Sequence, residues 1–485
     1  MSKKIILVES NEIPLRVFDM YASKRPNSAL AKLRAASIEF ETYTEDSLAL
    51  DPWISWPTFH RGVTDEKHQI LHLGQPVLEI DKKYPPIWKI LKQNRRSVGV
   101  FGSLYSSNVP ADVAEYAFYL PDYFDDKVFA HPRELLPFQE LNVSMTRASA
   151  RNVTRKIPKQ LLWNFAKSAR RSGLRMNTVG SSIAHMASEV INPARRIRRR
   201  NYQPMIMADL FVSQLKKTEP DFATFYTNHV AAAMHRYWAA AFPGDYETPM
   251  DSAWIKKYSD EILSAMGKLD VIIEQIVKFV DKNPEYVLML GGSMGQAAVP
   301  AQETHEFLTI VDPRKFMSWT GIPDDKWSVQ PAMVPCVCIA VDAAYRDVMA
   351  RRIAAMSIDG HPIVDNKRPT TPISFNEQQK GFFQVFIQFD NYAGEQHLVV
   401  EGKKYDFAEA GIGMMAHEDG VNCTAQHIPD GVLYVYSPKT PAAVAKPANR
   451  LRVSTVDIVP SIMDHFGIQP AEYMTGRPSL SRYLS

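Results

Sequence analysis

The chain has 485 residues, of which 45% are hydrophobic and 22% are charged. These proportions are ordinary for a globular protein and exclude a disordered, collagen-like or coiled-coil chain. The length allows a large buried core, organised as two or three domains or as one α/β domain with insertions. The net charge is only +3, so the distribution of charge along the chain is more informative than its sum.

The cysteines and the N-terminus favour a cytoplasmic protein. Cys336, Cys338 and Cys423 cannot form a disulfide framework, and the one-residue gap between the first two is not that of a redox or zinc pair. The apolar run 5–8 ends at Glu9, which is too short for a secretory signal. No stretch approaches the length of a membrane-spanning helix.

Short apolar runs in chain order predict five buried strands, at 5–8, 97–101, 222–226, 286–290 and 432–436. None of them alternates between polar and apolar residues, which is typical of strands covered on both faces of a parallel sheet. Helical periodicity between the runs predicts helices at 85–94, 206–217 and 253–281. This order favours an α/β fold with an open, mostly parallel sheet and helices on both faces.

Two segments interrupt the alternation of strands and helices. Residues 140–205 have helical spacing and many arginines, which predicts a basic helical insertion or cap. Residues 360–415 contain hairpin-like runs around Asn391–Gly394, which predicts a small antiparallel excursion. We therefore expect one core domain in two parts, 1–139 and 206–485.

Ligands of an open α/β sheet bind at the carboxyl ends of its strands, so polar residues beside the apolar runs are the candidate site. These residues are Glu9, Asn11, Glu12, Asn228, His229, His235 and His427. Thr58 joins them because it lies in an unusual aromatic and polar stretch, 51–62. Thr58 could equally cap a helix after Pro57, and a single histidine is more often structural than a ligand.

The order of these segments resembles the alkaline phosphatase superfamily, in particular its type I phosphodiesterases and its sulfatases. The segment Trp56–Gly62 is similar to the turn that carries the family's nucleophile, with Thr58 at the nucleophile position. Residues 225–238 are similar to the family's Asp…His segment, 427–431 to its last metal-binding histidine, and 454–467 to its closing helix. The resemblance implies the fold of that superfamily and a phosphate or sulfate ester as substrate.

The resemblance extends over about 1–110, 205–300 and 405–485, but the sequence departs from the family at its metal ligands. Asn11 stands where the family has an aspartate, and Ser293-Met294-Gly295 replaces its Asp-His-Gly. Near Asn228 the expected aspartate is also missing. Carboxylates neutralise the two dications of such a site, so one metal position is expected to lose nearly all of its ligands.

The other position is expected to keep one divalent metal. His229, His235 and His427 would bind it, a set that suits zinc, with manganese and magnesium as alternatives. Glu9 or Glu12 would supply compensating negative charge, with Glu9 as a further ligand.

These residues predict a hydrolase or transferase that acts on a small or glycan-linked phosphate or sulfate ester. Thr58 would attack, while Asn11, Glu12 and Asn228 would complete the catalytic site and orient the ester. Two alternatives stay open. The protein could be an inactive relative without a metal that binds an anionic ligand, or a re-purposed enzyme with Glu9 or Glu12 as general base.

Positive charge is concentrated in residues 151–200, which hold thirteen Lys and Arg against one acid, Glu189. The densest part is Arg195–Arg200, most simply a solvated helix face. An anionic membrane surface or an acidic polymer are the sharper alternatives. Nucleic acid is not expected, because no aromatic residues interleave with these arginines.

Overall fold

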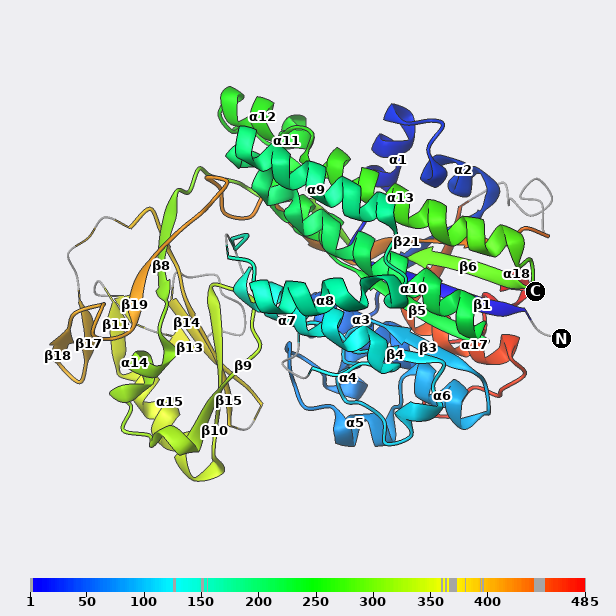
Figure 1. Ribbon diagram of the computed structural model, residues 1–485. Helices are drawn as coiled ribbons and strands as arrows, with labels where there is room; N and C mark the ends of the chain where they lie inside the picture. The colour runs from blue at the N-terminus through cyan, green and yellow to red at the C-terminus, as the bar shows by residue number, and fades with distance from the viewer. Residues whose placement is uncertain are drawn as a thin grey trace.

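The computed structural model describes residues 3–124, 128–149, 152–154, 156–358, 361–362, 364–365, 373–379, 381–392, 394, 397–439 and 450–484. Its centre is an eight-stranded sheet in the order β22-β2-β21-β6-β1-β5-β3-β4 (Figure 1). The strands are β1 (Lys4–Ser10), β2 (Ile38–Tyr43), β3 (Val98–Phe101), β4 (Phe118–Leu120), β5 (Phe222–Thr227), β6 (Tyr286–Gly291), β21 (Asp430–Tyr436) and β22 (Leu451–Ser454).

The sheet is mostly parallel, as predicted. Strand β21 pairs antiparallel with β6 and β2, and every other pairing in the sheet is parallel. All five predicted strands lie in it, and β5 and β6 are buried along their whole length. A run of apolar residues without alternation suits this position because both of its faces pack against helices.

Helices cover both faces of the sheet, which confirms the predicted fold class. Figure 1 shows α10, α11 and α13 on one side and α3, α6 and α17 on the other. The helices of this body are α1 (Leu15–Lys24), α2 (Ala29–Ala36), α3 (Pro52–Arg61), α4 (Asp65–His68), α5 (Leu78–Lys83), α6 (Ile87–Gln93), α10 (Gln203–Thr218), α11 (His229–Ala241), α12 (Ser252–Tyr258), α13 (Glu261–Lys282), α17 (Ile458–His465) and α18 (Ser481–Leu484).

The described part of 140–205 is helical. Its elements are α7 (Leu136–Ala148), α8 (Lys159–Ser172), α9 (Met176–Ile191) and the 3-10 helix η3 (Pro193–Tyr202). The described chain contains no helix that is both long and apolar enough to span a membrane.

An antiparallel region with its own hydrophobic core lies beside the main sheet. It begins at β8 (Glu306–Ile310), well before residue 360, so it is larger than the predicted excursion. Its other elements are α14 (Pro313–Ser318), β9 (Trp327–Gln330), β10 (Cys336–Val341), α15 (Arg346–Ala354), β11 (Met356–Ile358), β12 (His361–Pro362), β13 (Val364–Asp365), β14 (Ile373–Gln379), β15 (Phe382–Ile387), β16 (Phe389–Asp390), β17 (Leu398–Val400), β18 (Lys403–Tyr405) and β19 (Ile412–Ala416). Ala393, in the turn predicted at 391–394, lies outside the described residues.

Candidate metal centre

Polar side chains meet at the carboxyl edge of the central sheet. Because β1, β5 and β6 are parallel neighbours, the residues that follow β1 and β5 come together at one edge. Strand β20 (Ala425–Ile428) pairs with β7 (Gly295–Ala298), which follows β6, and places His427 opposite Gln296. The edge thus receives side chains from segments that are far apart in sequence.

Glu12, His235 and His427 form a triad at this edge. The Oε2 atom of Glu12 lies 3.0 Å from Nε2 of His235 and 3.3 Å from Nε2 of His427. The three potential ligand atoms all lie within 4.8 Å of one another, the spacing that a single metal ion requires. Glu12 is buried, whereas the two histidine side chains are partly exposed, so the triad can be reached from solvent.

The other ring nitrogen of each histidine is held by a backbone carbonyl. Nδ1 of His235 lies 3.0 Å from the carbonyl of Ala425, and Nδ1 of His427 lies 2.8 Å from that of Leu50. A carbonyl can only accept, so each Nδ1 carries the proton and each Nε2 is left to bind a metal through its lone pair when the ring is neutral. Asp51, whose Oδ1 is 3.3 Å from His427 Nδ1, supports the same arrangement. Histidine ligands of metals are typically oriented in this way.

The electrostatics of the triad also suit a dication. Burial disfavours the charged form of Glu12, but the neighbouring His427 and His235 hold the pKa of its carboxyl well below the ordinary value. Burial opposes protonation of His427, yet Glu12 and Asp51 raise its pKa to about 10. The pKa of His235 is raised well above its ordinary value, with Cys423 and Glu12 outweighing burial. Both shifts favour protonated imidazoles beside the Glu12 carboxylate, and a bound dication would take the place of these protons.

A shell of amides holds the carboxylate of Glu12. Asn11 donates from Nδ2 to Glu12 Oε1 at 2.5 Å and to Asn228 Oδ1 at 2.7 Å, and Gln296 donates to Glu12 Oε2. The indole of Trp56 in turn donates to Asn11 Oδ1 at 2.7 Å. Asn11 and Asn228 thus lie beside the triad, and their catalytic roles stay predictions.

The backbone at Glu12 is unusual. Its φ of +61° lies in the left-handed region, which costs an L-residue other than Gly roughly 1 kcal/mol or more. This turn directs the carboxylate to the two histidines just after β1 ends at Ser10. Local strain of this kind is concentrated at functional sites, because only the surrounding contacts can maintain it.

Thr58 does not join these contacts. Within the described chain its buried hydroxyl donates to Asp46 Oδ1 at 2.6 Å and lies 3.0 Å from His68 Nε2. Ser55 lies one helical turn closer to the start of α3, and its hydroxyl is 2.7 Å from that of Ser293, which follows β6. The hydroxyl beside the strand ends is therefore that of Ser55, and the nucleophilic role of Thr58 stays a prediction that its surroundings do not favour.

His229 and Glu9 also lie away from the triad. His229 is the first residue of α11, and its ring nitrogens contact Thr227 Oγ1 at 2.7 Å and the carbonyl of Ala265 at 3.1 Å. A separation of six residues turns His235 about 240° around the helix from His229, so their rings face different sides. Glu9 pairs instead with the fully buried His60 at 2.9 Å. The group that could hold one ion in the described chain is therefore Glu12, His235 and His427, and the ligand roles of His229 and Glu9 stay predictions that their contacts do not favour.

No protein-family model matches the chain, and no curated protein is similar to it. Solved structures match it over nearly the whole length. They include murine ectonucleotide pyrophosphatase/phosphodiesterase 5, as an inactive variant in complex with AMP, with 9% identity and a TM-score of 0.43 over 97% of this chain and 96% of that one. The human protein matches with 9% identity and a TM-score of 0.42 over 98% and 97%.

At 9% identity and with TM-scores below 0.5, these likenesses assign no role to any residue of this chain.

The buried His229 predicts a loss of stability in acid. Burial lowers its pKa to about 4, so the folded protein resists a proton that the unfolded chain accepts below about pH 6.5. Between about pH 6.5 and 4 the unfolded state therefore binds more protons than the folded state. The stability that the neutral His229 contributes is complete above about pH 6.5 and is lost as the pH falls towards 4. We expect His229→Gln to reduce the slope of unfolding free energy against pH by about 1.4 kcal/mol per unit near pH 5. Urea unfolding at a series of pH values measures this slope, and an unchanged slope would contradict the assignment.

The arginine cluster is largely paired inside the molecule. Arg198 binds Glu261 at 2.7 Å, Arg199 binds Glu189, and Arg200 lies 3.3 Å from Glu418. Three arginines of the cluster are therefore neutralised by acids of the same chain. The prediction of Arg195–Arg200 as one solvated face is corrected accordingly.

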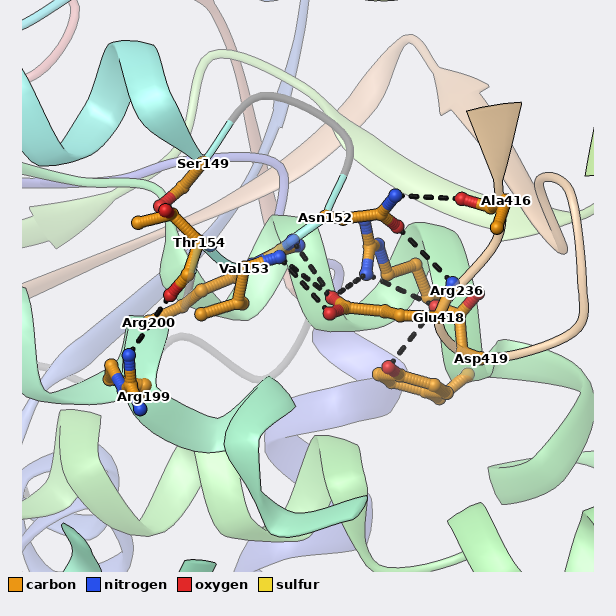
Figure 2. A network of polar contacts seen from close by, with 11 residues as sticks. Ser149, Asn152, Val153, Thr154, Arg199, Arg200, Arg236, Ala416, Glu418 and Asp419 are labelled. Atoms are coloured by element: carbon orange, nitrogen blue, oxygen red, sulfur yellow. Dashed lines mark hydrogen bonds and ion pairs between the residues drawn. The ribbon is translucent and has the colours of Figure 1, made fainter. Parts of the chain in front are cut away.

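Glu418 connects this basic segment to α11. Figure 2 shows its carboxylate between the backbone N–H of Val153, 3.1 Å from both oxygens, and the guanidinium of Arg236, 3.1 Å from Oε1. Asn152 adds two hydrogen bonds, to the carbonyl of Ala416 and from the N–H of Glu418. Since Arg236 directly follows His235, this network also fixes the part of α11 that carries a triad residue.

Proposed function

We propose that the protein is a hydrolase or transferase that acts on a phosphate or sulfate ester with one divalent metal, held by Glu12, His235 and His427. The observation that carries the proposal is the convergence of two Nε2 atoms on Glu12 Oε2 while both Nδ1 atoms are fixed by carbonyls. Three protein ligands leave open coordination positions, as in catalytic rather than structural zinc sites. A bound dication would supply positive charge for the ester oxygens and would acidify a bound water.

The charge of the triad supports an anionic substrate. One carboxylate and two neutral imidazoles leave a dication with one net positive charge, which attracts a phosphate or sulfate group. Asn228 accepts from Asn11 through Oδ1, and this leaves its amide NH2 as a donor for an ester oxygen. Glu12 is not favoured as a general base, because its pKa lies well below the ordinary value and its conjugate acid barely forms at neutral pH.

Metal analysis and ester hydrolysis test this proposal together. Purified protein is expected to bind one equivalent of zinc or manganese and to hydrolyse aryl phosphate or aryl sulfate esters only with the metal bound. Assaying both ester classes identifies which is the substrate. Binding of the metal without turnover of either ester would contradict the catalytic part of the proposal, and failure to bind one equivalent would overturn the metal site.

We propose Ser55 as the attacking hydroxyl. Its side chain, buried like that of Thr58, contacts Ser293, which follows β6 at the carboxyl edge of the sheet. We expect Ser55→Ala to lower kcat for the better ester on the order of 10³-fold or more, as removal of a nucleophile does. Thr58→Val is the matched control and is expected to change kcat less than tenfold. Full activity of Ser55→Ala would assign the attack to water instead, and a large loss in Thr58→Val alone would restore Thr58 as nucleophile.

A further inference from the structure

Helix α9 directs most of its polar side chains towards the protein and most of its large apolar side chains towards solvent. Met176, Ile183, Val190 and Ile191 are exposed to 79%, 63%, 84% and 87%. The first three recur every seven residues, which places them in one stripe along the helix. Two of the intervening outward positions are alanine and glycine, Ala187 and Gly180, so the stripe is interrupted by no charge.

The polar face of α9 packs against the protein. His185 is buried and stacks on Tyr202 with ring centroids 4.6 Å apart. Glu189, the only acid of the helix, binds Arg199 and lies 3.2 Å from His185. An ordinary surface helix has the reverse arrangement, so the apolar stripe of α9 requires a partner that is itself apolar.

The neighbouring helix α8 also carries exposed apolar side chains. Leu162 and Trp163 are exposed to 44% and 59%, and the ammonium group of Lys167 lies 5.2 Å from the Trp163 ring centroid. Only Gly173, Leu174 and Arg175 separate α8 from α9, so the end of one helix lies near the start of the other (Figure 1). We name this surface the α8–α9 face.

Cations surround the α8–α9 face. Arg170, Arg171 and Arg175 lie at the junction of the two helices, and Arg195 follows the exposed end of α9. Among the described residues, none of these four lies within ion-pair distance of a carboxylate. Unpaired arginines beside exposed aliphatic and tryptophan side chains are the features of a protein surface that binds an anionic lipid interface.

We propose that the α8–α9 face docks on an anionic membrane surface, with Met176, Ile183 and Val190 among the acyl chains and the arginines at the headgroups. Charge separates this occupant from a second copy of the chain. Within the described chain, the four arginines of this face carry unpaired positive charge, and the one acid of α9, Glu189, already binds Arg199, so two such faces would repel each other, whereas an anionic bilayer attracts them. The inference does not depend on the proposed catalytic activity.

Vesicle co-sedimentation with the full-length protein tests the inference. We expect binding to phosphatidylcholine vesicles that contain about 30% phosphatidylserine, and little binding to phosphatidylcholine alone. Ile183→Glu with Val190→Glu is expected to abolish binding, and Arg170→Gln with Arg171→Gln to weaken it about 25-fold, or about fivefold for each cation. Raising the salt from about 0.1 M to 1 M should weaken wild-type binding, because it shortens the screening length.

Val311→Glu with Val329→Glu is the matched control. These valines are also exposed, to 50% and 51%, but they lie in the antiparallel region, so this variant should bind as wild type does. Circular dichroism melts establish that each variant is folded. Equal binding to neutral and anionic vesicles, or unchanged binding of the Ile183→Glu, Val190→Glu variant, would overturn the inference. A third outcome would assign the face to self-association instead. In that case the wild-type protein does not bind vesicles, and light scattering shows that it is a dimer while this variant is a monomer.

Discussion

Replacing Glu12 with glutamine is expected to lower the affinity for zinc on the order of 100-fold or more. The variant removes the only carboxylate among the three ligands, and the affinity of a zinc site is distributed over a few ligands that must each be deprotonated. Glutamine has the same backbone cost at φ +61° and nearly the same shape, so the change isolates the charge. Competition with a chromophoric chelator measures the two dissociation constants.

Glu9→Gln is the control for this experiment. Glu9 lies near the end of β1, three residues before Glu12, and is equally buried, but its carboxylate binds His60 rather than the triad. It should leave the zinc affinity within a few-fold of wild type, even where it lowers stability. An equal loss of zinc in both variants would show that Glu12 acts through the fold and not as a ligand.

The second large effect is expected at Glu418. Glu418→Gln removes the negative charge that faces two largely buried guanidinium groups, those of Arg200 and Arg236. Breaking a buried ion pair leaves an uncompensated charge and typically costs about 3–5 kcal/mol of unfolding free energy. The remaining pairing of Arg236 with Asp419, at 3.1 Å, places the expected loss near the lower end, about 3 kcal/mol. Urea unfolding of the zinc-free protein measures this loss.

Glu274→Gln provides the comparison with an exposed pair. Glu274 binds Lys278 four residues further along α13, with side-chain exposures of 50% and 67%. Such a pair contributes less than about 1 kcal/mol, because water screens it. Similar losses in both variants would mean that the Glu418 network does not hold the helical segment to the main body.

The central sheet could be predicted because a single sequence property, an unbroken run of apolar residues, is typical of its fully covered strands. β1, β5 and β6 are covered on both faces, so unbroken apolar runs identify them. β2 was not predicted, although the buried Ile38, Phe40 and Thr42 alternate with partly exposed positions. Its half-buried pattern resembles many loop segments, and its partner β21 lies nearly 400 residues away in the sequence.

The edge of the sheet that carries the site was predictable, but the contacts within it were not. The rule for parallel sheets selected Glu12, His235 and His427 together with His229 and Glu9. His229 and His235 both lie in α11, about 240° apart around the helix, so the ring of His229 points away from the triad. Which of them binds Glu12 depends on the left-handed turn at Glu12.

Two further features required the tertiary structure. The position of Ser55 beside Ser293 depends on where α3 begins relative to β6. The pairing of Arg200 with Glu418 joins residues 218 apart, so no local pattern indicates it. The period of α9 likewise defines two faces but does not tell which of them is turned inward.

Because Glu12 has a left-handed backbone conformation, selection for thermal stability alone would remove this residue from the site. Glycine at position 12 would relieve the left-handed strain, and it would also remove the carboxylate that is buried between two rings. A library screened only for heat resistance, in the absence of metal, would therefore accumulate glycine or asparagine there. In the proposed metal centre, the glutamate at this position therefore carries a cost in stability in exchange for a metal ligand.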